Sequence, residues 1–478
     1  MTLMRPLKHS RAFLGGQWVS SEQTFVVTDP STGGGLGTVP DFGAEAVRIC
    51  VDAADAALEN WAGRTAMERG KVLRRWANLI LEHAGDLASL MTSEQGKPLS
   101  EARAEIVYAA GFIDWFAEEA KRAYGRVIPS PFADRRLMTV QKPVGVVAAI
   151  TPWNFPVAMI TRKLGPALAA GCTAIVKPSD LTPFSALALA DLAQRAGIPA
   201  GVLSVVTGQD AKGIGRALCD DPRVRKLSFT GSTAVGKQLY AQCAETMKRL
   251  SLELGGNAPF IVFDDADLEA AVAGAIASKF RNAGQTCVCA NRFYVQSGIY
   301  DAFVARLTEA VAELKVGPGH QAGVQIGPLI SPTAVQKVTE LVAGAMADGA
   351  RCLTGGQVLE GQFYAPTVLV DVRADSAITH TEIFGPVVAI QRFEAEDAAI
   401  ALANSIPTGL AAYAYTRDPA RMVRLTEGLQ TGMLGLNTGL ISTEVAPFGG
   451  VKESGLGREG GAEGLLEYLD TTYVCTGL

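Results

Sequence analysis

Three polar residues in distinctive surroundings could together carry acyl chemistry. Cys287 lies in FRNAGQTCVCANR, Glu253 in LSLELGG and Asn154 in TPWNFP. A soft sulfur nucleophile, a carboxylate base and an amide donor are the groups that acyl transfer requires. Each residue alone has a plainer interpretation, as a buried thiol, a strand-end acid facing water and a turn former. The three together favour a covalent mechanism on Cys287.

A phosphate-binding turn is indicated where the sequence reads FTGSTAVG, at residues 229–236. This stretch predicts a strand, a turn at Gly231 and Ser232, and the start of a helix. A helix N-terminus presents free N–H groups and partial positive charge to a phosphate. The pattern differs from the GxGxxG fingerprint, and any βα turn could contain it. Lys177, in IVKPSD, adds a cation at the end of a second predicted strand.

The charge and histidine content argue against several classes of function. The net charge is −5 over 478 residues, without a long run of one sign, whereas nucleic-acid binding needs clustered Lys and Arg. The four histidines, at positions 9, 83, 320 and 380, are too far apart in sequence to favour a metal site or a Ser-His-Asp triad. We therefore expect no nucleic-acid partner and no metal.

The apolar stretches and the cysteines indicate a soluble protein in a reducing compartment. No window reaches the ~18 uncharged apolar residues of a membrane span, and the N-terminal residues lack the apolar core of a secretory signal. The eight cysteines are scattered without a CxxC pair, which fits free thiols better than a disulfide framework. We expect a cytoplasmic protein without a membrane partner.

The elements that must position these residues alternate between strands and helices. Apolar residues at helical spacing predict helices over 44–120. Farther on, short apolar strands alternate with helices, one of which begins with Thr182 as N-cap and Pro183 in its first turn. This alternation predicts a parallel, doubly wound sheet that binds ligands at the carboxyl ends of its strands. Its predicted strands are Gly145–Ile150, Ala174–Lys177, Val202–Thr207 and Lys226–Phe229.

A second α/β region begins near Glu253, with a strand at Phe260–Phe263 and a helix at Leu268–Lys279. Residues 125–142 predict a protruding hairpin, and the C-terminal LEYLDTTYVCTGL predicts a strand that joins it. The fold class is therefore α/β, with two doubly wound parallel-sheet domains and a small β oligomerisation arm. The predicted parts are a dinucleotide-binding domain at 1–124 and 143–252, a catalytic domain at 253–440, and the arm at 125–142 and 459–478.

Seven motifs along the chain resemble the aldehyde dehydrogenase superfamily in order and in spacing. The resemblance covers essentially the whole chain, and long motifs in order are far more specific than any single one. It implies an aldehyde dehydrogenase-like fold, a nicotinamide cofactor, and a homodimer or homotetramer. The motifs are PWNFP at 152–156, VKPSD at 176–180, FTGS at 229–232, LELGG at 252–256, GQTC at 284–287, EIFGP at 382–386 and PFGGVKESGLGRE at 447–459.

The resemblance also implies a role for each motif residue. Cys287 would attack the aldehyde, Asn154 would stabilise the oxyanion, and Glu253 would activate water to hydrolyse the thioester that follows hydride transfer. The cofactor would be held by residues from five of the motifs. Lys177, Ser179 and Asp180 would face the adenosine ribose, Gly231 and Ser232 the pyrophosphate, Trp153 and Leu254 the cleft, Glu382 the nicotinamide ribose, and Phe384 the nicotinamide.

Within the superfamily, the chain most resembles succinate-semialdehyde dehydrogenases. The segments that carry this resemblance are MITRK at 159–163, KFRNAGQTCVCANR at 279–292 and GLISTEVAPFGG at 439–450. In that family two arginines and a serine hold the distal carboxylate, and the matching residues are Arg162, Arg281 and Ser442. Arginine suits this task because its planar fork binds a carboxylate through two parallel hydrogen bonds. The alternative is that both arginines form ordinary surface ion pairs. Glutarate semialdehyde is the second candidate substrate.

Asp180 bears on the choice between NAD and NADP. A carboxylate here repels a 2′-phosphate, so Asp180 favours NAD. Lys177 and Ser179 could nevertheless accept the phosphate of NADP. We expect NAD as the cofactor, with NADP as the alternative.

Two further questions stay open at the level of sequence. Cys289, two residues after Cys287, could close a regulatory disulfide, although a passive buried thiol is the favoured interpretation. A cofactor-independent cysteine acyl transferase or thioester hydrolase is the alternative from another class of enzyme. The turn at 229–236, Lys177 and Glu382 argue against it. A binding protein without activity would be expected to lack Cys287, Glu253 or Asn154, and all three are present.

Overall fold

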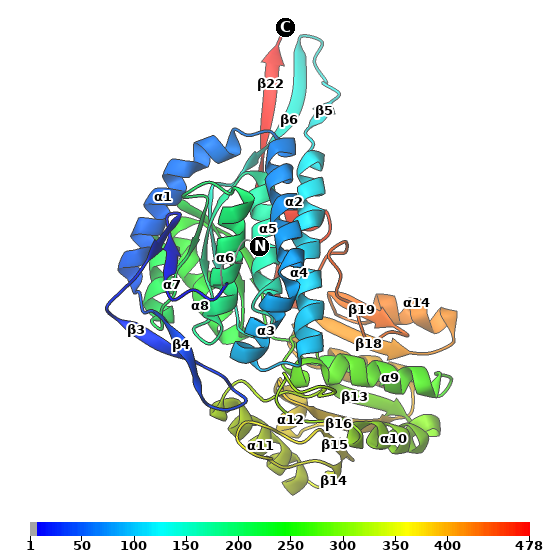
Figure 1. The fold of residues 1–478 in the computed structure, drawn as a ribbon. Coiled ribbons are helices and arrows are strands. Elements are labelled where there is room, and N and C mark those ends of the chain that lie inside the picture. The colour runs from blue at the N-terminus through cyan, green and yellow to red at the C-terminus, as the bar shows by residue number, and fades with distance from the viewer. Residues whose placement is uncertain (1–6) are drawn as a thin grey trace.

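The computed structural model describes residues 7–478 and has two α/β domains, with a narrow β arm that projects from the first of them (Figure 1). Among these residues, no helix is long and apolar enough to cross a membrane. They also contain no group of three or more His, Cys, Asp or Glu side chains that could hold a metal ion.

A parallel sheet in the order β9–β8–β7–β10–β11 forms the centre of the first domain. Alternate residues of its strands face opposite sides, so Val147 and Ala149 join one apolar cluster while Val146 and Ala148 join another. Both faces are thus covered, as the alternation of elements predicted. The strands are β7 (Val146–Ile150), β8 (Thr173–Lys177), β9 (Leu203–Val205), β10 (Val224–Thr230) and β11 (Arg249–Glu253), with the antiparallel β1 (Ala12–Leu14), β2 (Gln17–Val19) and β21 (Gly455–Leu456) at the edges.

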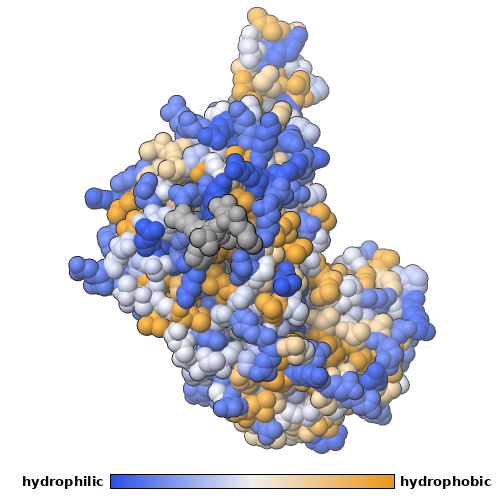
Figure 2. Space-filling model, in the orientation of Figure 1, coloured by the Kyte–Doolittle hydropathy of each residue, from blue (hydrophilic) through white to orange (hydrophobic). Residues whose placement is uncertain are grey.

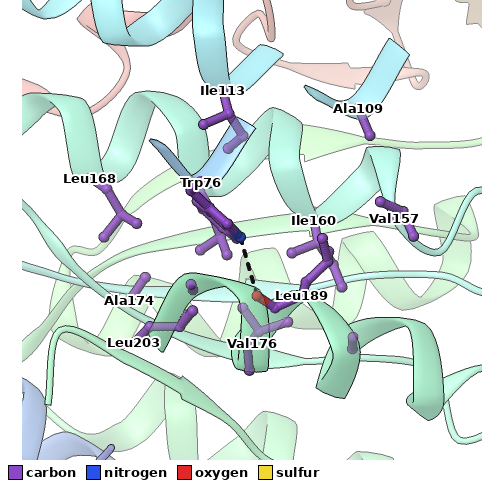
Figure 3. Packing of buried hydrophobic residues seen from close by; sticks show 14 of the residues in the cluster. Trp76, Ala109, Ile113, Val157, Ile160, Leu168, Ala174, Val176, Leu189 and Leu203 are labelled. Atoms are coloured by element: carbon purple, nitrogen blue, oxygen red, sulfur yellow. Dashed lines mark hydrogen bonds between the residues drawn. The ribbon is translucent and has the colours of Figure 1, made fainter. Parts of the chain in front are cut away.

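Helices pack on both faces of this sheet. Buried Trp76 lies among side chains of neighbouring helices, and its indole N–H donates to the Leu189 carbonyl over 3.2 Å (Figure 3). One face carries α2 (Ala66–Glu82), α3 (Ala84–Gln95), α4 (Leu99–Glu119), α5 (Ala158–Ala170) and α6 (Pro183–Ala196), and the other carries α1 (Ala44–Ala62), α7 (Ala211–Asp220) and α8 (Thr233–Cys243).

The start of α6 confirms the predicted N-cap position and shows which side chain makes the capping hydrogen bonds. Thr182 does occupy the N-cap position before Pro183, but its side chain makes no capping hydrogen bond. The carboxylate of buried Glu94 accepts instead, from the backbone N–H groups of Phe184 at 2.9 Å and Ser185 at 2.7 Å. The two oxygens of one carboxyl group satisfy two free N–H groups at once, which one hydroxyl cannot do.

The second domain has a sheet in the order β14–β15–β16–β13–β12–β18–β19, in which only the edge strand β14 is antiparallel. Strand β12 turns Phe260 and Val262 to one apolar cluster and Ile261 to the other. The predicted helix at Leu268–Lys279 is present with these bounds as α9. The strands are β12 (Ala258–Val262), β13 (Ala290–Gln296), β14 (Arg351–Thr354), β15 (Thr367–Val370), β16 (Val387–Phe393), β18 (Ala411–Tyr415) and β19 (Met433–Leu436), covered by α9, α10 (Ser297–Ala312), α11 (Pro332–Ala347), α13 (Glu396–Asn404) and α14 (Pro419–Gly428).

The arm is a three-stranded antiparallel sheet in the order β22–β6–β5. Its strands are β5 (Arg126–Ile128), β6 (Arg135–Pro143) and β22 (Leu469–Gly477). The C-terminal strand therefore joins the hairpin as predicted, and it begins at Leu469, three residues into LEYLDTTYVCTGL. Residues before it belong elsewhere, because β21 pairs with β11 of the first sheet and Glu459 is buried against α5.

Candidate active site

Cys287 follows α9 on a loop with unusual backbone angles. Asn282 and Ala283 have left-handed φ values of 51° and 54°, and Gly284 follows with a φ of 75°. A Cβ atom on Gly284 would lie 2.2 Å from the carbonyl oxygen of Gly385, so the position requires glycine. Non-glycine residues held in this region cost about 1–3 kcal/mol each, and such strain concentrates at functional sites. The loop is thus held in one conformation just before Cys287.

Asn154 lies on the loop after β7 and is 4% exposed. Its side-chain amide donates to the carbonyl of Gln285 over 3.1 Å, and Gln285 precedes Cys287 by two positions in the chain. An amide has two N–H groups, so this bond orients the side chain and leaves the second N–H for a ligand. Asn154 and Cys287 line the same cavity.

Glu253 is the last residue of β11 and is buried at 3% exposure. Neither of its carboxylate oxygens has a hydrogen-bond partner within residues 7–478. Burial, and next the negative charge of Glu459, raise the pKa of Glu253 well above its ordinary value, against the opposing charges of Arg162 and Lys163. A carboxylate in these surroundings is a stronger proton acceptor than one in water. It shares a cavity with Cys287.

The Cys287 thiol is protonated at neutral pH. Burial raises its pKa to about 12, while Arg162 and Arg281 lower it and Glu253 and Glu382 raise it further. The thiolate is the reactive form of a cysteine. A base must therefore take the proton when the sulfur reacts.

Glu459 is a buried acid of this site that sequence reasoning missed. Its carboxylate forms ion pairs with Lys163 at 2.5 Å and Arg162 at 2.8 Å. Burial opposes ionisation, but the Lys163 and Arg162 charges prevail and lower the pKa of Glu459. A signal was present in the sequence, since two adjacent cations in an otherwise apolar helix require a buried counter-charge. The sequence could not show which residue supplies that counter-charge, because Glu459 lies 296 positions from Lys163 in the chain.

The residues predicted to bind the cofactor line two neighbouring cavities. Both cavities border Pro152, Thr230 and Gly231, at the carboxyl ends of β7 and β10. Such a site fits the general rule for doubly wound sheets. Lys177, Ser179 and Asp180 line one cavity, Trp153, Ser232, Leu254, Glu382 and Phe384 line the other together with Asn154, Glu253 and Cys287, and Gly231 lines both.

Several of these residues make defined contacts at the edge of the cavities. Ser232 caps α8 by accepting from the Val235 N–H at 3.4 Å, as the turn predicted. Burial raises the pKa of Glu382 to about 7, although the Gly256 N–H donates to its carboxylate at 3.2 Å. Trp153 packs edge-on against Phe384, with ring centroids 5.7 Å apart. Lys177 is 4% exposed, and its ammonium group donates to the Pro178 carbonyl at 2.9 Å.

A separate cavity borders Cys287 from the other side and contains the predicted substrate residues. Arg162, Arg281 and Ser442 all line it. Arg281 lies 5.4 Å from the Phe155 ring and forms no ion pair among residues 7–478. Arg162 is 1% exposed and pairs with Glu459, so neither arginine forms the surface ion pair of the alternative interpretation. Cys287 lines both this cavity and the one with Glu382.

Two buried donors in this cavity lack partners. The Nε atom of Arg162 and the hydroxyl of Tyr108 have no hydrogen-bond partner within the part of the chain that the structure describes. Buried polar groups normally have hydrogen-bond partners, so two donors without partners in one cavity indicate a ligand with acceptor oxygens. Tyr108 was missed from the sequence, where it is one of four aromatic residues in α4 and nothing sets it apart.

Cys289 is buried at 1% exposure, and its thiol lies 3.5 Å from the Lys279 carbonyl. This placement fits a small buried side chain. All eight cysteines are free thiols. A Cys287–Cys289 disulfide remains a hypothesis from the sequence.

Comparison with known proteins gives matches along the whole chain. The model of the aldehyde dehydrogenase family matches residues 18–474. Succinate-semialdehyde dehydrogenase [NADP(+)] GabD of Escherichia coli is 57% identical over 476 residues, covering 99% of this chain and 98% of that protein. A glutarate-semialdehyde dehydrogenase of Pseudomonas putida is 57% identical, covering 98% of each. A crystal structure of an E. coli NADP-dependent enzyme has a TM-score of 0.98 at 57% identity, covering 99% of each chain.

Proposed function

Because the chain belongs to the aldehyde dehydrogenase family, we propose that it oxidises a semialdehyde with a distal carboxylate, succinate semialdehyde first and glutarate semialdehyde second. The observation that carries this proposal is the cavity that Cys287 shares with Arg162, Arg281 and Ser442. The unpaired donors of Arg162 and Tyr108 support an anionic ligand. A pocket discriminates one methylene by only ~1–3 kcal/mol, so both semialdehydes fit the proposal.

In the first half of the proposed reaction, the Cys287 sulfur attacks the aldehyde carbon. Glu253 lines the same cavity and is made more basic by burial, so it can take the thiol proton. The free N–H of the Asn154 amide and the Cys287 backbone N–H stabilise the oxyanion of the tetrahedral adduct. A nicotinamide held beside Glu382 and Phe384 would supply the acceptor for the hydride that leaves this carbon, and loss of that hydride leaves a thioester on Cys287.

In the second half, Glu253 first releases the thiol proton to solvent and then removes a proton from a water molecule that attacks the thioester carbon. The bond between that carbon and the Cys287 sulfur then breaks, and the sulfur recovers a proton. Asn154 again stabilises the oxyanion. The carboxylic acid product carries one oxygen from water. This sequence requires Glu253 to be unprotonated when water attacks, which makes hydrolysis faster as the pH rises through the pKa of Glu253.

Replacing Glu459 with Gln is expected to shift the pH dependence of thioester hydrolysis to lower pH, by about one unit. The Glu459 charge raises the pKa of Glu253, and its removal also leaves Arg162 and Lys163 free to lower that pKa. Both changes act in the same direction. Single-turnover rates of thioester hydrolysis, measured from about pH 6 to about pH 10, would give the shift of the pH–rate profile. An unchanged profile, in a variant that remains folded, would contradict the assignment.

The residues around the two cofactor cavities fit a nicotinamide dinucleotide. The N-terminus of α8 at Ser232 suits a pyrophosphate. A Cβ atom on Gly255 would lie 3.1 Å from the Glu382 carboxylate, so glycine keeps space open in the cavity assigned to the nicotinamide ribose. Asp180 favours NAD, while the close relative from E. coli is described as NADP-dependent. We propose that this chain accepts both, with buried Lys177 as the cation near the adenosine ribose.

Replacing Asp180 with Ala is expected to raise the ratio of kcat/KM for NADP to that for NAD by about tenfold. The change removes a carboxylate that repels the 2′-phosphate and binds ribose hydroxyls, an effect of roughly 1–2 kcal/mol at a partly exposed site. The ratio is measured on wild type and variant with one aldehyde at saturation. A ratio that stays constant would place Asp180 outside the cofactor site.

Replacing Arg281 with Ala is expected to lower kcat/KM for succinate semialdehyde about 100-fold, and to change it less than about threefold for butanal. Arg281 forms no ion pair among residues 7–478 and lines the cavity that borders Cys287, so we expect the loss to reflect mainly its interaction with the substrate carboxylate. Arg373→Ala is the matched control, because Arg373 is exposed and pairs with Asp375. Equal losses on both aldehydes would reject a carboxylate-binding role for Arg281.

We propose that the arm pairs with a second copy of this chain, giving a homodimer or homotetramer. The outer edge of β22 is unpaired among the described residues, and the arm projects from the first domain with hydrophobic residues on its surface (Figures 1 and 2). Val127 is 84% exposed and Tyr473 is 58% exposed. Strand edges and apolar side chains of this kind are ready sites for association. Free thiols throughout the chain support a reducing, cytoplasmic location.

A further inference from the structure

The segment between α3 and α4 places a buried cation in contact with the backbone carbonyl of Asn154. Lys97 is 2% exposed, and its ammonium group donates to the backbone carbonyl of Asn154 at 2.7 Å. It also pairs with Glu105 of α4 at 2.5 Å and lies 4.0 Å from the centroid of the Phe155 ring. Lys97 thus contacts both Asn154 and the next residue, although it lies 57 positions away in the chain.

Glu105 extends this network to the start of α5. The second oxygen of its carboxylate accepts from the backbone N–H groups of Val157 at 3.0 Å and Ala158 at 3.2 Å. The helix has no side-chain cap from its own N-cap residue, so Glu105 supplies the cap. Helix α5 carries Arg162 and Lys163. The Lys97–Glu105 pair therefore holds the loop that contains Asn154 at its middle and at its junction with α5.

A second chain of hydrogen bonds reaches the loop of Cys287. The Gln95 side chain accepts from the Lys97 N–H at 3.0 Å and donates to the Asn282 side chain at 3.0 Å. The Asn282 amide in turn donates to the carbonyl of Asn154 at 3.0 Å. One carbonyl oxygen, that of Asn154, thus joins the strained loop before Cys287 to the buried ammonium of Lys97.

A buried ion pair gives little net stability, because desolvation of both charges offsets their attraction. The contacts of Lys97 instead define geometry, since they converge on the residue that must lie within hydrogen-bond reach of the reacting oxygen. We propose that Lys97 is a positioning residue that holds the Asn154 amide and the Cys287 loop in register for the attack on the aldehyde. This inference rests on the oxyanion role of Asn154 in the proposed function.

The test is a double-mutant cycle between Lys97 and Asn154. Lys97→Met is expected to lower kcat/KM by about 100-fold, the size of the loss from a displacement of about 1 Å in a catalytic group. In the Asn154→Ala background, the same substitution is expected to lower kcat/KM by less than about threefold, because residues that act as a unit are non-additive. The Kd of the nicotinamide dinucleotide, measured by fluorescence, is expected to stay within about twofold.

A second variant separates positioning from folding, because Lys97→Met leaves the Glu105 carboxylate buried and unpaired. Lys97→Met/Glu105→Gln removes both charges and keeps an oxygen that accepts from Val157 and Ala158. Its Tm is expected to recover towards the wild-type value while kcat/KM stays low. Recovery of kcat/KM together with Tm, or equal losses in the two backgrounds of the cycle, would overturn the inference. If Asn154→Ala alone has no effect, the proposed function of Asn154 fails instead.

Discussion

Replacing Cys287 with Ser is expected to lower kcat/KM by about four powers of ten or more with every aldehyde. A serine hydroxyl has a far higher pKa than a thiol, and an alkoxide is not formed by a carboxylate base in this cavity. The substitution exchanges one atom, so the fold and the cofactor cavities are retained. The rate is measured as formation of reduced nicotinamide at saturating cofactor, and cofactor binding is measured separately by fluorescence.

The matched control for this variant is Cys352→Ser. Cys352 lies on the edge strand β14, is half-buried, and lines neither of the cavities that border Cys287. Its replacement is expected to leave kcat/KM within about twofold of wild type, as surface substitutions generally do. Turnover by Cys287→Ser within about tenfold of wild type would show that the reaction does not pass through this sulfur.

Replacing Glu253 with Gln is expected to lower steady-state turnover by about three powers of ten, yet to allow one turnover of hydride transfer per site. The amide occupies the same volume but cannot remove a proton from water, so the thioester on Cys287 accumulates. Rapid mixing of the variant with aldehyde and cofactor would show a burst of reduced nicotinamide, equal to the concentration of sites. The initial attack is slowed as well, because the Cys287 thiol has a pKa of about 12 and loses its best proton acceptor.

Two outcomes for Glu253→Gln would conflict with this mechanism. Steady turnover near the wild-type rate would mean that another group activates the water. No burst at all, with the cofactor bound, would contradict the expected single turnover and would mean that no other group can take the Cys287 proton in the absence of Glu253. Raising the pH separates these cases further, since hydroxide at high pH replaces a general base in hydrolysis but does not restore a lost nucleophile.

Local sequence signals predicted much of the fold. The strand at Val146–Ile150 and the helix at Leu268–Lys279 follow from short apolar runs and from caps, which depend on residues close in sequence. The turn at Gly231 and Ser232 was predicted for the same reason. The catalytic candidates Cys287, Glu253 and Asn154 were found from their residue types at strand ends and loops. The structure brings all three to one cavity.

Contacts between distant segments could not be predicted in the same way. Glu94 caps α6 from 90 residues away, whereas the sequence indicated only that Thr182 occupies the N-cap position. Glu459 neutralises Arg162 and Lys163 from the far end of the chain, and Lys97 reaches Asn154 across the interior of the domain. Each of these is a buried charge, and a single sequence contains no record of which charges meet after folding.

The central claim is a covalent bond between the Cys287 sulfur and the acyl carbon of the substrate. The most direct measurement is mass spectrometry of Glu253→Gln after mixing with succinate semialdehyde and cofactor, followed by peptide mapping. We predict that the chain gains the mass of one succinyl group and that the added mass maps to Cys287. A chain that completes the burst without any added mass, or that carries it on another residue such as Cys289, would contradict the account.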